Sequence, residues 1–236
     1  WPNTNKNKMK ISKINKNIAV VLVAGSAITM NSWLDNVPAI LDVWYPGEQG
    51  GNAIFDVIFG KVNPSGKLPI TFPKSYSQYP ANFYSYDSEI EYKEDIYVGY
   101  RYFDKYKKEV LFPFGHGLSY TDFKYSKLKV STKKNTTNVC VKIENTGKSD
   151  GADVIQLYVR DLESSVDRPI KELKAFKKVL LKKGEKKTIE FKLTERAFAF
   201  WDDFSKDWKV ESGEFEILIG KSSKDIILKK IINIKR

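Results

Sequence analysis

Neighbouring carboxylates are the side chains in this sequence whose types and spacing could act on a glycosidic bond. That chemistry needs one carboxyl group as the acid and a second as the nucleophile on the other side of the bond. For each candidate pair, a solvated loop carboxylate or an ion-pair partner is the simpler interpretation, so we assign no catalytic residue. The pairs are Glu89/Glu91, Glu94/Asp95 and Asp202/Asp203, and the last of them looks like part of a turn.

Glu94 has the most unusual surroundings of these acidic residues. It lies beside Tyr92, Tyr97 and Tyr100, and Arg101 follows it by seven residues. We expect a buried pair between Glu94 and Arg101 to lock this aromatic stretch. Arg101 itself is predicted to be a buried or semi-buried structural arginine that meets a carboxylate or stacks on a ring.

Other reactive residue types offer little chemistry. The chain has one histidine, His116, and one cysteine, Cys140, so we expect no metal site, no serine–histidine–aspartate triad and no internal disulfide. Cys140 is expected to be a small buried hydrophobe. A glycine cluster at residues 47–51 precedes a predicted helix, but it lacks the phosphate-binding patterns, and a tightly packed turn is the preferred interpretation. We expect no cofactor.

The composition of the chain argues against nucleic acids and membranes as binding partners. The net charge is +11, but 35 of the basic residues are lysine and only five are arginine. Arginine is the residue that binds phosphates and base edges with two parallel hydrogen bonds, so the charge indicates a solvated lysine-rich surface and no nucleic acid. The longest apolar run, residues 18–24, is too short to cross a membrane, and no signal peptide is visible. We therefore expect no membrane contact and a cytoplasmic location.

The first part of the chain has an α/β pattern. Residues 18–23 and 39–44 are continuous apolar runs, which are typical of strands buried on both faces of a parallel sheet. A short helical turn is predicted over residues 30–36, and a helix over 53–59 that ends at Gly60. A surface helix is also expected to end near Asn15. Because only two such strands are present, a large apolar surface should face water.

The rest of the chain contains two segments that differ in composition and hydrophobic pattern from the first part. Residues 63–121 contain five prolines and many tyrosines, which predicts an extended connector lying against a larger body. Beyond it, alternating segments predict a fibronectin type III-like, immunoglobulin-fold β-sandwich, because no Cys…Trp…Cys spacing exists. The expected strands are residues 125–131, 138–144, 153–159, 173–181, 188–193, 197–201, 214–219 and 226–234.

Several motifs together resemble glycoside hydrolase family 3, the β-glucosidases and β-xylosidases. They occur in the family's order and cover most of the chain. The motifs are PAILDVWYPGEQGGNA at 38–53, NPSGKLPITFP at 63–73, YKEDIYVGYRYF at 92–103, FPFGHGLSYT at 112–121, NTGKSDGADVIQLYV at 145–159 and RPIKELKAF at 168–176. The resemblance implies the end of the family's α/β sandwich domain (residues 1–73), an aromatic connector (74–118) and a fibronectin type III-like domain (119–236).

The resemblance also implies a function for the intact enzyme. Family members hydrolyse β-linked glucosides or xylosides with retention, using an aspartate on an N-terminal barrel and a glutamate from a loop of the α/β domain. Residues 1 and 2 resemble the helix after that loop, so both carboxylates are expected upstream of Trp1, and His116 receives no catalytic role. This chain would be a scaffold, with Gly25, Ser26 and residues 45–51 nearest the active-site face.

Two other readings remain open at this stage. The first is a non-catalytic carbohydrate- or protein-binding module built on the β-sandwich. The second is a basic nucleic-acid binder, which a steep salt dependence of DNA binding would reveal.

Overall fold

The computed structural model describes residues 11–80 and 92–235, which fall into two compact units. We call the first, comprising residues 1–62, 71–91 and 109–112, the α/β unit. The second, the sandwich unit, comprises residues 63–70, 92–108 and 113–236. The connector is therefore shared between the two units. The domain boundaries at residues 73 and 118 stay a prediction.

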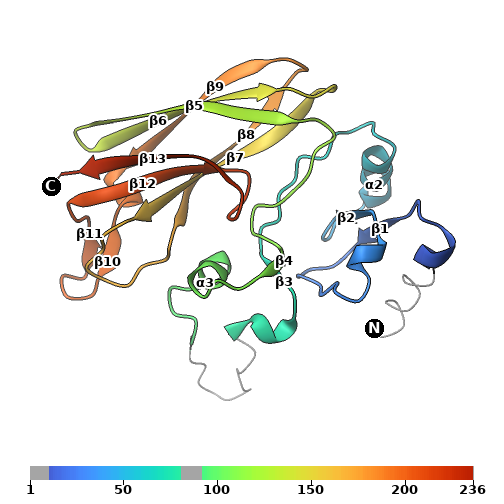
Figure 1. The fold of residues 1–236 in the computed structure, drawn as a ribbon, viewed down its shortest axis with the longest axis horizontal. Helices are drawn as coiled ribbons and strands as arrows, with labels where there is room; N and C mark the ends of the chain where they lie inside the picture. The colour runs from blue at the N-terminus through green and yellow to red at the C-terminus, as the bar shows by residue number, and fades with distance from the viewer. Residues whose placement is uncertain (1–10, 81–91, 236) are drawn as a thin grey trace. The chain divides into compact units, whose positions relative to one another are not determined.

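Two parallel strands form the centre of the α/β unit. Strands β1 (Ala19–Leu22) and β2 (Ala39–Asp42) pair in parallel with Ala19 opposite Ala39 (Figure 1). The predicted short turn is the 3-10 helix η1 (Leu34–Asn36), and the predicted helix is α2 (Gly50–Ile58). The α/β pattern is thus confirmed. Residues 11–14 are helical; the rest of the expected surface helix, and the resemblance at residues 1 and 2, lie outside the described residues.

A second small sheet completes this unit. Strands β3 (Phe72–Pro73) and β4 (Val110–Phe112) pair antiparallel, and the 3-10 helix η2 (Tyr76–Gln78) follows β3. Met30, Trp33 and Phe72 are almost fully buried. They are the largest fully buried side chains among the described residues of this unit.

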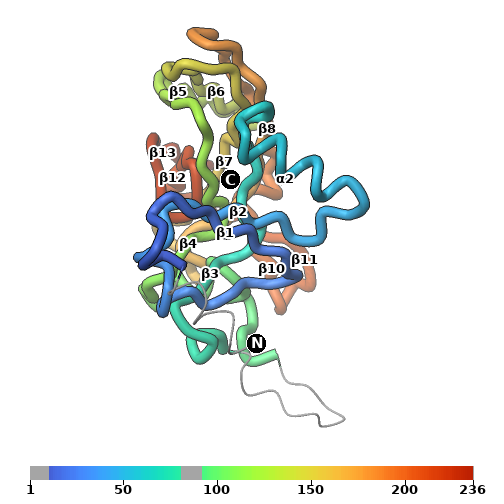
Figure 2. Tube along the Cα trace, turned by 90° about the vertical axis from the view of Figure 1, so that its right-hand side faces the viewer, coloured from blue at the N-terminus to red at the C-terminus, as the bar shows by residue number. Residues whose placement is uncertain are grey.

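The sandwich unit consists of two antiparallel sheets packed face to face (Figure 1). One sheet has the order β5-β6-β9 and the other β13-β12-β7-β8, and a separate hairpin joins β10 to β11. The strands β12 and β13 lie side by side at the C-terminal end of the chain in Figure 2 as well. The elements are α3 (Tyr100–Lys105), β5 (Phe123–Lys133), β6 (Thr136–Asn145), β7 (Gly151–Asp161), β8 (Glu172–Leu181), β9 (Lys186–Thr194), η4 (Glu195–Ala197), β10 (Phe200–Asp202), β11 (Asp207–Lys209), β12 (Gly213–Gly220) and β13 (Ile226–Ile234).

Alternation along the strands builds the core between the sheets. On β6, Val139, Val141 and Ile143 are fully buried, whereas the residues between them are partly exposed. Side chains alternate across a strand, so each second residue of a half-buried strand enters the core. Burying such a side chain is worth about 1.5–3 kcal/mol. The predicted fibronectin type III-like sandwich is confirmed.

Three local expectations were wrong. The connector contains the helix α3, because no proline lies between Pro80 and Pro113 to prevent one. The strand expected over residues 197–201 is instead η4 followed by the short β10. Cys140 is only partly buried, because its neighbours Val139 and Val141 both point into the core and force it to the outer face.

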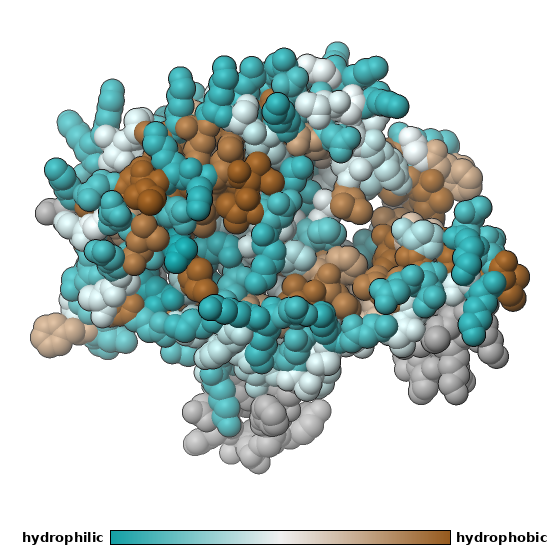
Figure 3. Space-filling view, in the orientation of Figure 1, coloured by the Kyte–Doolittle hydropathy of each residue, from teal (hydrophilic) through white to brown (hydrophobic). Residues whose placement is uncertain are grey.

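The α/β unit exposes much apolar surface, as expected. Several of its exposed apolar side chains lie on α2 and on the segments that follow β1, β2 and α2; they are Val23, Tyr45, Phe55, Ile58, Phe59 and Val62. Brown apolar surface is visible in this region of the space-filling view (Figure 3). A two-stranded sheet cannot cover both faces of strands this apolar.

Replacing Ile143 with alanine should destabilise the sandwich by about 2–5 kcal/mol, because a fully buried side chain leaves a cavity. Lys142→Ala, one residue earlier on β6, is the matched control and should change the unfolding free energy by less than about 0.5 kcal/mol. Chemical denaturation of both variants measures the difference. Equal losses would mean that β6 is not held in this register.

Candidate functional site

The carboxyl ends of β1 and β2 carry the two loops that the sequence placed nearest an active-site face. The loops meet through Gly25 and Tyr45: a Cβ atom on Gly25 would lie 2.4 Å from the Tyr45 hydroxyl oxygen. Only glycine therefore allows the ring to lie against this backbone. Tyr45 remains 80% exposed, so this ring is held in place at an open edge of the sheet.

Asp42 and Trp44 shape the end of β2. Trp44 adopts a left-handed backbone conformation with φ of 52°, and its ring meets Phe72 edge-on at 6.2 Å between centroids. Its backbone N–H donates weakly to Asp42 Oδ1 at 3.4 Å. The other carboxyl oxygen, Oδ2, is buried without a hydrogen-bond partner in the part of the chain described here. Burial raises the pKa of Asp42 and outweighs that backbone contact.

The glycine cluster forms the tight turn that the sequence favoured. Gly50 opens α2 and is buried, and a Cβ atom there would lie 2.7 Å from the ring of Pro46. Gly47 and Gly60 have φ values of 71° and 72°, which most other residues adopt at a cost. These glycines serve the path of the backbone between β2 and the end of α2.

The other acidic residues of the α/β unit lie in separate places. Asp35 belongs to η1, Glu48 is exposed before α2, and Asp56 on α2 meets Lys61 at 3.8 Å. Glu89 and Glu91 lie outside the described residues. The structure therefore gives Asp35, Glu48 and Asp56 ordinary surface or ion-pair positions.

The remaining acidic candidates belong to the sandwich unit. Glu94 is half-buried and Asp95 exposed, both in a turn before α3. Asp202 ends β10 and accepts a hydrogen bond from the Ser205 hydroxyl at 2.6 Å, while Asp203 lies in the hairpin turn. The turn expected there is confirmed, and its carboxylates support the hairpin.

Arg101 is a semi-buried structural arginine, as expected, but its partner differs. Its guanidinium meets Glu172 Oε1 on β8 at 3.2 Å, with the two side chains 35% and 16% exposed. The prediction that Arg101 pairs with Glu94 was wrong. The two partners lie far apart in the sequence, and only the fold of the sandwich unit brings β8 to α3.

Glu172 is the centre of a larger group of charges. Arg168 Nη2 lies 3.3 Å from its Oε2 and Lys174 Nζ lies 3.0 Å away, while Arg168 Nη1 also meets Asp161 at 2.8 Å. Burial alone would raise the pKa of Glu172, but Lys174, Arg101 and Arg168 together outweigh it, and the pKa falls below its usual range. The group ties α3, β7 and β8 to one another.

Three further contacts fasten α3 to the rest of the sandwich unit. Asp104 is buried and meets Lys171 Nζ at 2.5 Å and Lys224 Nζ at 3.0 Å. The Tyr100 hydroxyl accepts a hydrogen bond from the Leu173 backbone N–H at 2.7 Å. Sequence reasoning missed these partners, although the lysine and glutamate of the motif at 168–176 were a usable signal.

The chain after α3 is fastened to β7. Gln156 Nε2 donates to the backbone oxygens of Gly115 (3.0 Å) and Lys221 (2.8 Å), and the Tyr158 hydroxyl donates to Gln156 Oε1 at 2.6 Å. A Cβ atom on Gly115 would lie 2.2 Å from the Gln156 amide oxygen. Glycine at position 115 is therefore required for this contact.

Within the described residues, no group of three or more histidine, cysteine, aspartate or glutamate side chains could hold a metal ion. Among the helices of residues 11–80 and 92–235, none combines the length and hydropathy that crossing a bilayer requires.

Two family models match the chain. The glycosyl hydrolase family 3 C-terminal domain matches residues 2–120, and the fibronectin type III-like domain matches residues 153–223. Together they cover most of the sequence.

Curated relatives match most of the chain but only part of their own length. Thermostable beta-glucosidase B of Acetivibrio thermocellus is 50% identical over 230 residues, which are 95% of this chain and 30% of the relative. An exo-alpha-(1->6)-L-arabinopyranosidase of Bifidobacterium breve is 44% identical over 92% of the chain and 29% of its own length. The chain thus spans about a third of these relatives.

Solved structures of beta-glucosidases also match almost the whole chain. The GH3 beta-glucosidase of Bifidobacterium adolescentis superposes with a TM-score of 0.95 at 41% identity, covering 99% of this chain and 35% of the other. The beta-glucosidase of Kluyveromyces marxianus, in complex with glucose, gives a TM-score of 0.94 at 38% identity and covers 99% and 28%.

Arg101→Ala should lower the unfolding free energy by about 1–2 kcal/mol, since the guanidinium is a third exposed and water partly replaces its partner. Glu172→Ala should cost more, about 3–5 kcal/mol, because it leaves several buried cations without their carboxylate. Denaturant titration of both variants measures the two losses of unfolding free energy and shows which is larger. If Arg101→Ala costs as much as Glu172→Ala, the charges around Glu172 do not act as one group.

The group also predicts a pH dependence. The pKa of Glu172 is lowered in the folded state, so its contribution to stability is present above the unfolded value of about 4.3 and is lost as the pH falls below it. Glu172→Gln should therefore flatten the acid limb of a stability-against-pH curve. Glu163→Gln, on a loop of the same unit, is the control and should retain the wild-type slope. An unchanged slope in Glu172→Gln would contradict the lowered pKa.

Proposed function

The chain belongs to glycoside hydrolase family 3, and we propose that it is the scaffolding, C-terminal part of an enzyme that releases terminal β-D-glucosyl or β-xylosyl residues. The reaction of the intact enzyme would be retaining: an aspartate attacks the anomeric carbon, a glutamate protonates the leaving oxygen, and water then hydrolyses the glycosyl-enzyme. The names of the curated relatives, β-glucosidase first among them, support this substrate class.

The observation that carries the scaffolding role is the open face of the α/β unit. Its exposed apolar side chains need neighbouring strands and helices, which the longer relatives have room to supply. The proposed partner of this face is the portion of the enzyme that contains the barrel. Retaining hydrolysis needs two carboxyl groups about 5–5.5 Å apart on a floor that holds the sugar, and the barrel would supply that floor.

The edge formed by Gly25 and Tyr45 gives the scaffold a specific task. Ligands of open α/β sheets bind beyond the carboxyl ends of the strands, where these two loops meet. The ring of Tyr45 is placed by contact with the Gly25 backbone and remains exposed. We assign this edge the task of completing the wall of the active site in the assembled enzyme.

The purified chain should release no nitrophenol from an aryl β-glucoside, and a separately produced barrel-containing portion should restore hydrolysis when the two are mixed. The physical reason is that, in this proposal, the floor that orients the sugar belongs to the barrel-containing portion. Colorimetric assay of each part and of the mixture tests this. Hydrolysis by the chain alone, abolished by Glu48→Gln or Glu94→Gln, would place an acid/base residue here and overturn the proposal.

A paired variant tests the edge. Gly25→Ala introduces a Cβ atom 2.4 Å from the Tyr45 hydroxyl and should lower the activity of the mixture, because the ring must move. Gly51→Ala, at a position with open space around it, should leave the activity near the unmodified level. Equal activities of the two variants would contradict the proposal that the loop edge completes the wall of the active site.

A further inference from the structure

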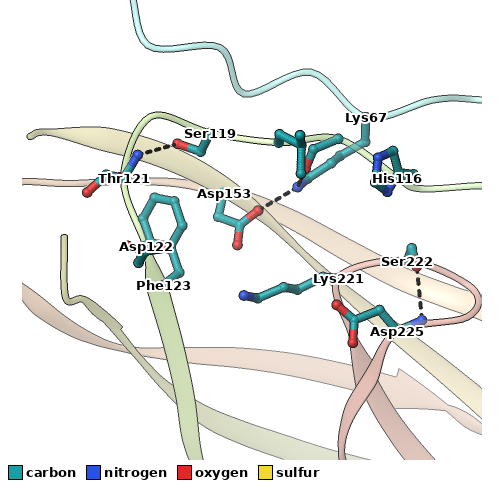
Figure 4. Close-up of a pocket in the computed structure, with 12 residues that line it drawn as sticks. Lys67, His116, Ser119, Thr121, Asp122, Phe123, Asp153, Lys221, Ser222 and Asp225 are labelled. Carbon is teal, nitrogen blue, oxygen red and sulfur yellow. Dashed lines mark hydrogen bonds and ion pairs between the residues drawn. The ribbon is translucent and has the colours of Figure 1, made fainter. Parts of the chain in front are cut away.

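A hollow of about 230 Å³ opens in the sandwich unit, at the end of the core where the connector joins β5 (Figure 4). Four stretches of the unit line it: Lys67, residues 116–123, Asp153 on β7, and the turn between β12 and β13 at residues 221–225. The hollow is independent of the loop edge described above, because every lining residue belongs to the sandwich unit.

One wall of the hollow is a fixed framework. Lys67 Nζ lies 3.0 Å from Asp153 Oδ1, with the side chains only 12% and 4% exposed, and it donates to the Gly117 backbone oxygen at 2.7 Å. The Tyr125 hydroxyl donates to the other oxygen of Asp153 at 2.8 Å. The charges of Lys67 and Asp153 therefore satisfy each other and form a rigid wall.

The turn between β12 and β13 presents a second pair of charges. Lys221 extends its ammonium group into the hollow, 5.8 Å from the ring centroid of Tyr125, and Asp225 stands on the same turn (Figure 4). Backbone hydrogen bonds from Lys221 N–H to the Asp225 oxygen (2.9 Å) and from Asp225 N–H to Ser222 Oγ (3.0 Å) fix the turn. Within the described residues, neither Lys221 nor Asp225 has a side-chain ion pair.

The charges of the hollow nearly cancel. Burial, together with the positive charge of Lys67, lowers the pKa of His116, so this ring is neutral at pH 7. Two lysines then face Asp153 and Asp225, and Asp122 adds one carboxylate at the rim. An anion would meet these carboxylates and a cation would meet Lys221, so neither charged class of ligand fits.

We propose that this hollow binds a compact neutral polyol, such as a monosaccharide or a cyclitol. Hydroxyl groups both donate and accept hydrogen bonds, so neighbouring hydroxyls can accept from Lys221 and donate to Asp225 at the same time. The volume equals that of about seven or eight liquid waters, which suits one sugar ring. Phe123 and Leu118 offer apolar contact to the C–H face of the ring. This inference does not rest on the proposed function.

The test is an amide NMR titration of the full chain with D-glucose, with myo-inositol and with inorganic phosphate. We expect saturable shifts from glucose or inositol at residues 116–123 and 221–225, and none there from phosphate. Saturation by phosphate alone would show an anion site, shifts confined to residues 25–51 would place the sugar elsewhere, and no saturable shift from either polyol would remove the site. Each of these three outcomes overturns the proposal.

Variants identify the binding groups. Lys221→Met and Asp225→Asn should each weaken polyol binding by about tenfold, the loss expected for a hydrogen bond to a charged group. Lys229→Met, on the exposed side of β13, is the matched control and should bind as the unmodified chain does. Melting temperatures verify that the variants fold. Unchanged affinity in folded Lys221→Met and Asp225→Asn would contradict the assignment.

Discussion

The sandwich unit depends on polar and charged side chains buried outside its hydrophobic core. Glu172 on β8 and Gln156 on β7 lie where a bare sheet would meet water, yet both are buried or nearly so. A buried charge or amide is costly unless its hydrogen bonds are made. The connector supplies one partner to each of them: Arg101 on α3 meets Glu172, and the backbone oxygen of Gly115 accepts a hydrogen bond from Gln156. Residues 92–108 and 113–118 of the connector are thus a required part of the sandwich unit.

Features that depend on local geometry were predicted from the sequence, whereas features that depend on distant partners were not. Alternation in residues 139–143 and the continuous runs in β1 and β2 determine burial through local geometry, and both were predicted correctly. The glycine turn before α2 and the semi-buried state of Arg101 followed from residue types alone. The choice of Glu172 over Glu94 did not, because pairing across many residues depends on strand order, which one sequence does not reveal.

The α/β unit and the hollow of the sandwich unit differ in how far the sequence predicted them. In the α/β unit, the sequence correctly indicated strands too apolar for a two-stranded sheet. The close approach of Gly25 and Tyr45 beyond these strands was not predicted. The hollow near Lys221 could not be predicted, since it arises where the connector, β7 and the turn after β12 converge in space. The chain belongs to glycoside hydrolase family 3 and spans about a third of the length of the relatives it matches.

Hydrogen exchange of the full chain tests most directly whether the connector belongs to the sandwich. The informative amides are those of Leu68, Gly115 and Leu173, which donate to His116, Leu68 and Tyr100 oxygens respectively. We predict that they exchange as slowly as the amides of β7, because they open only when the unit unfolds. Exchange at the rate of exposed loops, with β7 still protected, would contradict the claim that buried polar contacts make the connector part of this unit.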